Sequence, residues 1–111
     1  MKLYAAYIKE AANMELEYTN EYFFTYKIKE NEIYLQDVFI KEEFRNNGLI
    51  DIILNKVYSI AKEKNKKLVS TSICKNIKKE NKQRSTHIIT KRGYIEYESD
   101  NYMIYYYKEI E

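Results

Sequence analysis

Apolar residues recur along the chain with two different periods, which predict helices and strands in mixed order. The strongest helical period lies between Gly48 and Glu63, where apolar residues form one stripe along a helix. The stripe consists of Leu49, Ile50, Ile53, Leu54, Val57, Ile60 and Ala61. A shorter stripe predicts a helix over residues 2–13, and a third helix is expected over residues 81–92.

Segments rich in β-branched and aromatic residues predict six strands. They cover residues 14–19, 22–28, 33–40, 67–73, 94–98 and 102–110. Residues 32–73 read as strand, helix and strand, so we expect two parallel strands joined by a right-handed crossover. The fold class is therefore α+β: three antiparallel strands, a strand–helix–strand unit, a helix and a last hairpin. The length of 111 residues predicts one domain, residues 1–111.

The composition narrows the functional classes. With 19 basic and 17 acidic residues the net charge is +2, which is too even to indicate a nucleic-acid-binding domain. One cysteine, Cys74, and one histidine, His87, exclude a disulfide framework, a four-cysteine zinc site and a paired-histidine metal site. Cys74 is expected to be a half-buried thiol and His87 a surface residue. No apolar run is long enough for a membrane span or a signal peptide, so we predict a cytoplasmic protein.

Glycine and proline mark one candidate site. The chain has no proline and two glycines, Gly48 and Gly93. Gly48 lies where a strand and a polar loop, residues 41–47, lead into the strongest helix. The first amides of a helix have no intrahelical partner and attract anions, and Arg45 adds a donor beside them. A single glycine without a following Gly-Lys-Ser/Thr fits neither a phosphate loop nor a dinucleotide fingerprint.

Two motifs resemble those of the GNAT family of acyl-CoA N-acyltransferases. The segment I-K-E-E-F-R-N-N-G-L-I is similar to the family signature V-x-P-x-x-R-G-x-G-x-G/A, with Ile40, Arg45 and Gly48 at the valine, the arginine and the middle glycine. K-R-G-Y, residues 91–94, resembles the later K-x-G-F. The likeness covers about residues 20–110 and implies a GNAT-like mixed sheet with a central acyl-CoA-binding strand–helix–strand unit and a shortened N-terminal region.

Four positions depart from the family pattern. Asn46 stands in place of the glycine after the arginine, Glu42 in place of a common proline, and Ile50 in place of the small residue that ends the signature. Ile89 occupies the position where many members carry the tyrosine that protonates the leaving thiolate. The isoleucine at position 89 affects the expected protonation of the thiolate more than the expected binding of the cofactor.

The resemblance implies acetyl-CoA as co-substrate and assigns residues to it. The pantetheine arm is expected along the backbone of Val38, Phe39 and Ile40. The diphosphate is expected on the amides of the signature turn, which comprises Arg45, Asn46, Asn47, Gly48, Leu49 and Ile50. Asn81, near the start of the third helix, is expected to contact the cofactor.

The resemblance also implies catalytic roles. A lysine-type amine is protonated at neutral pH, so a base must accept its proton. Asp37 on the signature strand is the candidate base, with Glu32 as a less direct one. With isoleucine at position 89, the acid that protonates the thiolate is expected to be Tyr94 or one of the C-terminal tyrosines, Tyr105, Tyr106 and Tyr107.

The resulting hypothesis is an N-acetyltransferase that transfers an acetyl group from acetyl-CoA to a primary amine. The shortened N-terminal region favours an open acceptor site, so a protein lysine is one candidate acceptor, on a monomer or a homodimer. One alternative is a catalytically weak or inactive GNAT-fold module that binds CoA or a protein partner. Another, disfavoured by the charge balance, is a nucleic-acid-binding protein that uses tyrosines as stacking platforms.

Overall fold

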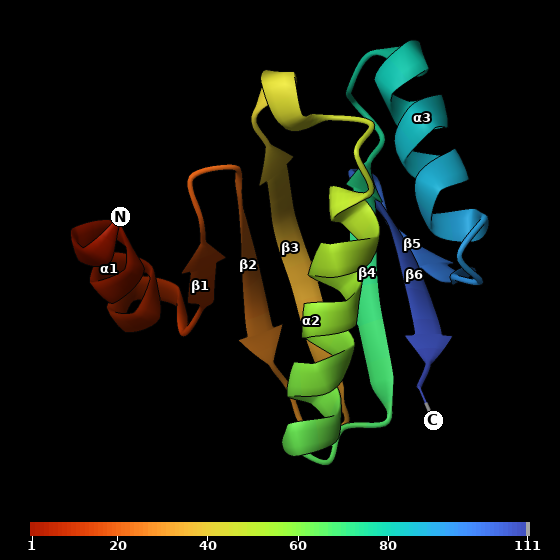
Figure 1. The fold of residues 1–111 in the computed structure, drawn as a ribbon. Helices are drawn as coiled ribbons and strands as arrows, with labels where there is room; N and C mark the ends of the chain where they lie inside the picture. Colours follow the sequence, from red (N-terminus) through yellow and green to blue (C-terminus); the bar gives the residue numbers. More distant parts are fainter. Residues whose placement is uncertain (111) are drawn as a thin grey trace.

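The computed structural model describes residues 1–110 as three α-helices, one short 3-10 helix and six strands (Figure 1). The elements are α1 (Lys2–Ala12), β1 (Glu15–Tyr18), β2 (Tyr22–Ile28), β3 (Glu32–Ile40), η1 (Glu42–Phe44), α2 (Leu49–Glu63), β4 (Leu68–Cys74), α3 (Lys79–Thr90), β5 (Ile95–Ser99) and β6 (Met103–Glu109). Every predicted helix and strand is present, with ends that differ from the prediction by at most two residues.

The strands form one sheet in the order β1-β2-β3-β4-β6-β5. All neighbouring pairs are antiparallel except β3 and β4, which are parallel and are joined by α2. The predicted α+β class and the strand–helix–strand unit are therefore confirmed. The third helix was expected over residues 81–92, whereas α3 spans Lys79–Thr90 and so begins and ends two residues earlier.

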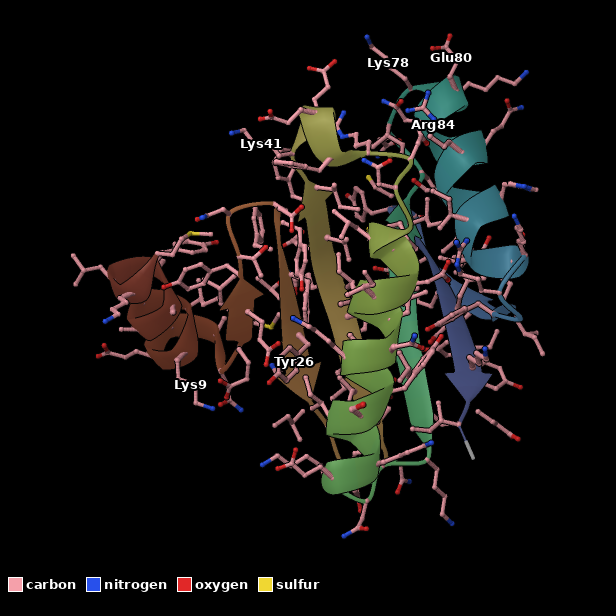
Figure 2. All side chains as sticks on the ribbon, viewed as in Figure 1. Lys9, Tyr26, Lys41, Lys78, Glu80 and Arg84 are labelled. Carbon is pink, nitrogen blue, oxygen red and sulfur yellow. The ribbon has the colours of Figure 1, made fainter. Side chains whose placement is uncertain are left out.

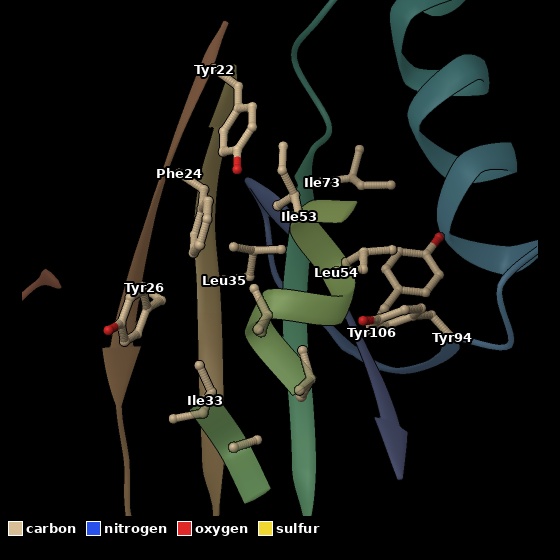
Figure 3. Packing of buried hydrophobic residues seen from close by; sticks show 13 residues of the cluster. Tyr22, Phe24, Tyr26, Ile33, Leu35, Ile53, Leu54, Ile73, Tyr94 and Tyr106 are labelled. Carbon is tan, nitrogen blue, oxygen red and sulfur yellow. The ribbon is translucent and has the colours of Figure 1, made fainter. Parts of the chain in front are cut away.

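Helix α2 covers the middle of the sheet and supplies the centre of the core (Figure 3). The side chains of Ile53, Val57 and Ala61 on this helix are at most 1% exposed. They pack in one cluster with Ile33 of β3 and Val69 of β4, which are fully buried. Burial of each large aliphatic side chain stabilises the fold by about 1.5–3 kcal/mol, so this cluster fixes α2 over the two parallel strands.

The two parallel strands pair along only part of their length. Cα partners run from Glu32 with Leu68 to Leu35 with Thr71. Beyond that point β3 continues to Ile40 and β4 to Cys74 without pairing to each other. The edge of each strand that faces the other is therefore free of ladder hydrogen bonds over these last residues.

A β-bulge lies in β3 where the strands part. Thr25 of β2 is opposite Asp37, whereas the next residue, Tyr26, is opposite Leu35, so Gln36 has no partner across β2. The extra residue resets the alternation of side chains. Leu35 and Val38 consequently share the sheet face that packs on α2, and Asp37 turns to the opposite face.

Positive φ angles occur at both glycines and at three asparagines. Gly48 has φ +79° and Gly93 has φ +91°. Glycine adopts such angles without steric cost because it has no Cβ. A Cβ at Gly48 would meet no atom within 4 Å, so conformation rather than crowding favours glycine there. Asn46 has φ 64°, and asparagine is the side-chain-bearing residue that tolerates this region best. Asparagine can therefore adopt at this position the backbone conformation that glycine adopts freely.

Within residues 1–110, no helix is long and apolar enough to cross a membrane. The same residues contain no cluster of three or more histidine, cysteine, aspartate or glutamate side chains that could hold a metal ion.

Ser70 gives a test of the packing. Its hydroxyl is buried, the residue is 1% exposed, and no hydrogen-bond partner lies among the described residues. An unsatisfied buried hydroxyl costs about 1–3 kcal/mol, so Ser70→Ala should raise the free energy of unfolding by about 1 kcal/mol. Urea denaturation of the variant and of the unaltered protein measures this difference in the free energy of unfolding. Thr71→Val, which removes the Oγ1 bond to the Leu35 carbonyl (3.0 Å), should lower the same quantity. A lower free energy of unfolding in Ser70→Ala would contradict the view that the buried Ser70 hydroxyl lacks a hydrogen-bond partner.

Asn46 tests the account of the turn. Asn46→Gly should leave the free energy of unfolding within about 0.5 kcal/mol of its original value, because glycine adopts the same φ freely. Asn46→Val should lower it by about 1–2 kcal/mol, because a β-branched residue is strained at positive φ. Thermal unfolding of the two variants provides the comparison. Equal stabilities of the glycine and valine variants would show that the turn does not need this conformation.

Candidate active site

A groove of about 990 Å³ follows the line where β3 and β4 part. Its walls come from β3, β4, α2 and α3. Side chains from both faces of the sheet line it: Val38 and Ile73 belong to the face under α2, and Phe39 and Ser72 to the other. The gap between the strands therefore opens toward both sides of the sheet.

Most of the residues predicted for the site line this groove. They are Asp37, Val38, Phe39, Ile40, Arg45, Asn46, Ile50, Asn81 and Tyr94. Asn47, Gly48 and Leu49 do not line it, although they belong to the turn and first residue of α2 beside it. The structure thus gathers residues from four separate segments of the sequence at one place.

The start of α2 is open at the end of this groove. Gly48 is the N-cap residue, and no side chain caps the helix. The first helical hydrogen bond runs from the Ile52 amide to the Gly48 carbonyl (3.3 Å), which leaves the preceding amides of the first turn without a helical acceptor. These amides and the positive end of the helix dipole form a place where an anion is stabilised.

Arg45 differs in part from the prediction. Its amide donates to the Glu42 carbonyl (3.2 Å), so the free amides begin at Asn46 and not at Arg45. Its Nε donates to the Ile40 carbonyl (2.8 Å), and the guanidinium lies 5.6 Å from the centre of the Phe39 ring. The charge of Arg45 is thereby fixed at the end of β3, beside the free amides.

An acidic residue in the first turn of α2 is neutralised. Asp51 accepts hydrogen bonds from Nε of Arg92 (2.7 Å) and from Nη2 (3.1 Å). These bonds hold the pKa of the Asp51 carboxyl below its usual range. Since the guanidinium balances this carboxylate, its repulsion of an anion at the helix start is reduced.

Asp37 is oriented by the neighbouring strand. The Thr25 hydroxyl donates to Oδ2 of Asp37 (3.2 Å) and accepts from the Asp37 amide (3.1 Å). The aspartate is exposed, lines the groove and follows the bulge residue Gln36. It therefore lies beside the parted strands, whereas Glu32 lies at the paired end of β3, opposite Leu68.

Tyr94 lies deeper than expected for a proton donor. It is 3% exposed, and its hydroxyl forms a hydrogen bond with the hydroxyl of Tyr58 on α2 (2.8 Å). Burial, followed by the bond to Tyr58, raises the pKa of Tyr94 far above its usual range. The phenol thus stays protonated and releases its proton reluctantly. Of the other candidate tyrosines, Tyr106 is in the core, while Tyr105 and Tyr107 lie on the sheet face opposite α2.

Several groove residues were missed from the sequence. Arg84 and Ser85 on α3 and Ser72 on β4 line the groove. Counting from Asn81 along one helical face leads to residues 84, 85, 88 and 89, so the helical period was a signal that could have identified the two α3 residues. Cys74 also lines the groove and is half-buried as predicted, and His87 is exposed as predicted.

Charged side chains gather at the groove end of the molecule. Figure 2 shows Lys41, Lys78 and Arg84 there, together with Glu80. Lys41 pairs with Glu43 (2.9 Å), so it contributes little free charge. Arg84 and Arg45 line the groove itself, which favours an anionic ligand at this end.

Comparisons with known proteins identify the fold. No protein-family model and no curated protein matches the sequence. Solved structures do match: the PaiA N-acetyltransferase of Thermoplasma acidophilum in complex with coenzyme A is 16% identical with a TM-score of 0.76, covering 98% of this chain and 70% of that one. A GNAT family acetyltransferase of Elizabethkingia anophelis with acetyl-CoA bound is 16% identical, with a TM-score of 0.73 and coverage of 98% and 82%.

A third structure agrees with these two. A putative GNAT family acetyltransferase of Desulfovibrio desulfuricans is 13% identical with a TM-score of 0.75, covering 97% of this chain and 76% of that one. Identities this low establish the architecture and leave the activity to separate argument. The chain has the fold of the GNAT acetyltransferases.

Proposed function

We propose that this protein is an acetyl-CoA-dependent N-acetyltransferase of the GNAT family that acetylates a primary amine. The observation that carries the proposal is the groove between parted parallel strands, which ends at an uncapped helix start. Two similar structures are described as complexes with coenzyme A or acetyl-CoA, which supports the same ligand here.

The groove suits the parts of acetyl-CoA in order. The diphosphate would lie on the amides of Asn46 to Ile50, with Arg45 and Arg84 supplying positive charge. The pantetheine would extend along the unpaired edge of Val38 to Ile40, where free backbone groups can bond its amides. Asn81 lines the same groove from α3. The thioester would then lie near Gln36 and Asp37, where the strands meet.

The reaction is direct attack of the amine on the thioester carbonyl. Asp37 accepts the proton of the amine, and Thr25 keeps its carboxylate aimed beside the gap. A nitrogen–carbon bond forms, the carbon–sulfur bond breaks, and CoA leaves as a thiolate, which must then gain one proton to become the free thiol. Because the gap opens toward both sides of the sheet, the amine would approach from the side opposite α2. A protein lysine and a small amine both fit such an open approach.

A catalytically weak or inactive CoA-binding module is the second candidate. Ile89 in place of the usual tyrosine and the hydroxyl bond between Tyr94 and Tyr58 favour it. Incubation of the protein with acetyl-CoA and a panel of polyamines and lysine peptides distinguishes the transferase from the binding module. Thiol release with an acceptor supports the transferase. Stabilisation by acetyl-CoA without thiol release on any acceptor favours the module.

The helix start is tested by two variants of one position. Gly48→Asp should weaken the binding of acetyl-CoA by about 10-fold or more, because one carboxylate a few ångströms from a diphosphate costs about 1–2 kcal/mol. Gly48→Asn has nearly the same shape and the same tolerance of positive φ, and it should weaken binding only about 2-fold. Isothermal titration calorimetry measures both. Equal affinities of the two variants would place the diphosphate elsewhere.

The assigned base is tested by Asp37→Asn. Loss of general-base catalysis should lower kcat by about 10²-fold while the affinity for acetyl-CoA stays within about 2-fold. Thiol release measures the rate, and calorimetry measures the affinity. The control is Glu32→Gln at the paired end of the same strand, which should retain the original kcat. An Asp37→Asn variant with unchanged kcat would remove Asp37 from the mechanism.

A further inference from the structure

Two hydroxyl groups meet across the point where the parallel strands part. The hydroxyl oxygen of Tyr34 on β3 lies 2.5 Å from Oγ of Ser72 on β4, and either can donate the hydrogen bond. Tyr34 precedes Leu35 and Ser72 follows Thr71, the last paired residues of the two strands. The pair therefore spans the closed end of the gap.

Ser72 is the member of the pair that reaches the groove. It is half-buried and lines the groove, while Tyr34 does not. Both side chains are on the sheet face opposite α2, because Tyr34 alternates with the core residues Ile33 and Leu35, and Ser72 is opposite Tyr105. The pair thus connects the groove with the other side of the sheet.

We propose that Ser72 and Tyr34 form a proton relay that protonates the departing thiolate of CoA. This inference rests on the proposed transferase function. As the carbon–sulfur bond breaks, the Ser72 hydroxyl gives its proton to sulfur and takes the proton of the Tyr34 hydroxyl. Tyr34 then regains a proton from water, and Asp37 releases to water the proton it took from the amine. The products are the amide and the free thiol, and no oxidant or further reactant is consumed.

The surroundings of Tyr34 suit a transient negative charge. The ammonium of Lys29 lies 4.8 Å from the centre of the Tyr34 ring and attracts a phenolate. Tyr97 and Tyr105 lie near Tyr34 on this face, and Glu98 lies near both of these tyrosines, with Glu32 near Tyr97 and Asp100 near Tyr105.

Other hydroxyls at the groove are less suited to this role. The Tyr94 hydroxyl is committed to Tyr58, and its raised pKa makes it a weak acid. The Thr71 hydroxyl donates to the Leu35 carbonyl (3.0 Å) on the α2 side. The position usually held by the family's tyrosine is Ile89, which has no proton to give. The relay therefore supplies a proton donor that the altered signature lacks.

The experiment compares two donors of different leaving ability. With acetyl-CoA, Ser72→Ala and Tyr34→Phe should each lower kcat by about 10²-fold and leave KM for acetyl-CoA within about 3-fold. With an aryl thioacetate, whose more acidic thiol leaves without protonation, the two variants should react within about 3-fold of the unaltered protein. Tyr97→Phe, a tyrosine of the same sheet face outside the groove, should match the unaltered protein with both donors.

The outcomes separate the relay from the function. Variants that are slow with acetyl-CoA and normal with the aryl thioacetate support the relay. Equal slowing with both donors indicates that the pair only holds the strands in place and overturns the relay. Variants as fast as the unaltered protein with acetyl-CoA overturn the relay and leave the transferase standing. Absence of thiol release by the unaltered protein with every acceptor overturns both.

Discussion

The parting of β3 from β4 after Leu35 and Thr71 is the constraint on which the site depends. Parallel strands normally satisfy their backbone groups on each other, and these two stop doing so while both strands continue. The core under α2 holds the paired half together through Ile33, Val69 and Ile53. The free half then offers a row of unpaired backbone groups beside a gap, so a rigid fold carries an open binding edge.

The same geometry explains why the remaining parts of the site lie where they do. The bulge at Gln36 turns Asp37 away from the core and toward the gap, where Thr25 fixes its carboxylate. The turn through Asn46 and Gly48 directs the free amides of α2 to the far end of the groove. One continuous groove therefore joins the uncapped start of α2 to the Asp37 carboxylate, which is the arrangement that the proposed transfer of an acyl group from acetyl-CoA needs.

The fold could be predicted from the sequence, because the apolar periods of α2 and the β-rich runs are strong and local. The place of the site along β3 and the start of α2 was expected only from the resemblance of two motifs to the GNAT signatures. The bulge was missed, although the spacing of Ile33, Leu35, Val38 and Ile40 breaks the strand period at that place. The engagement of the Arg45 amide by Glu42 and of Tyr94 by Tyr58 could not be predicted. The contact between Tyr94 and Tyr58 depends on how segments distant in sequence pack, which no local pattern records. The Arg45 bond is local: it closes the short 3-10 helix η1 inside the segment that was expected to be a polar loop. Asn46 tolerates positive φ, but a motif written with glycine at this position does not indicate that asparagine can replace it.

Amide chemical shifts of the isotope-labelled protein during titration with coenzyme A test the central claim most directly. The account predicts that the largest changes cluster at residues 46–50 and along residues 36–40 of β3, with α1 and β1 unaffected. No change at millimolar coenzyme A, or changes confined to residues outside the groove, would contradict it.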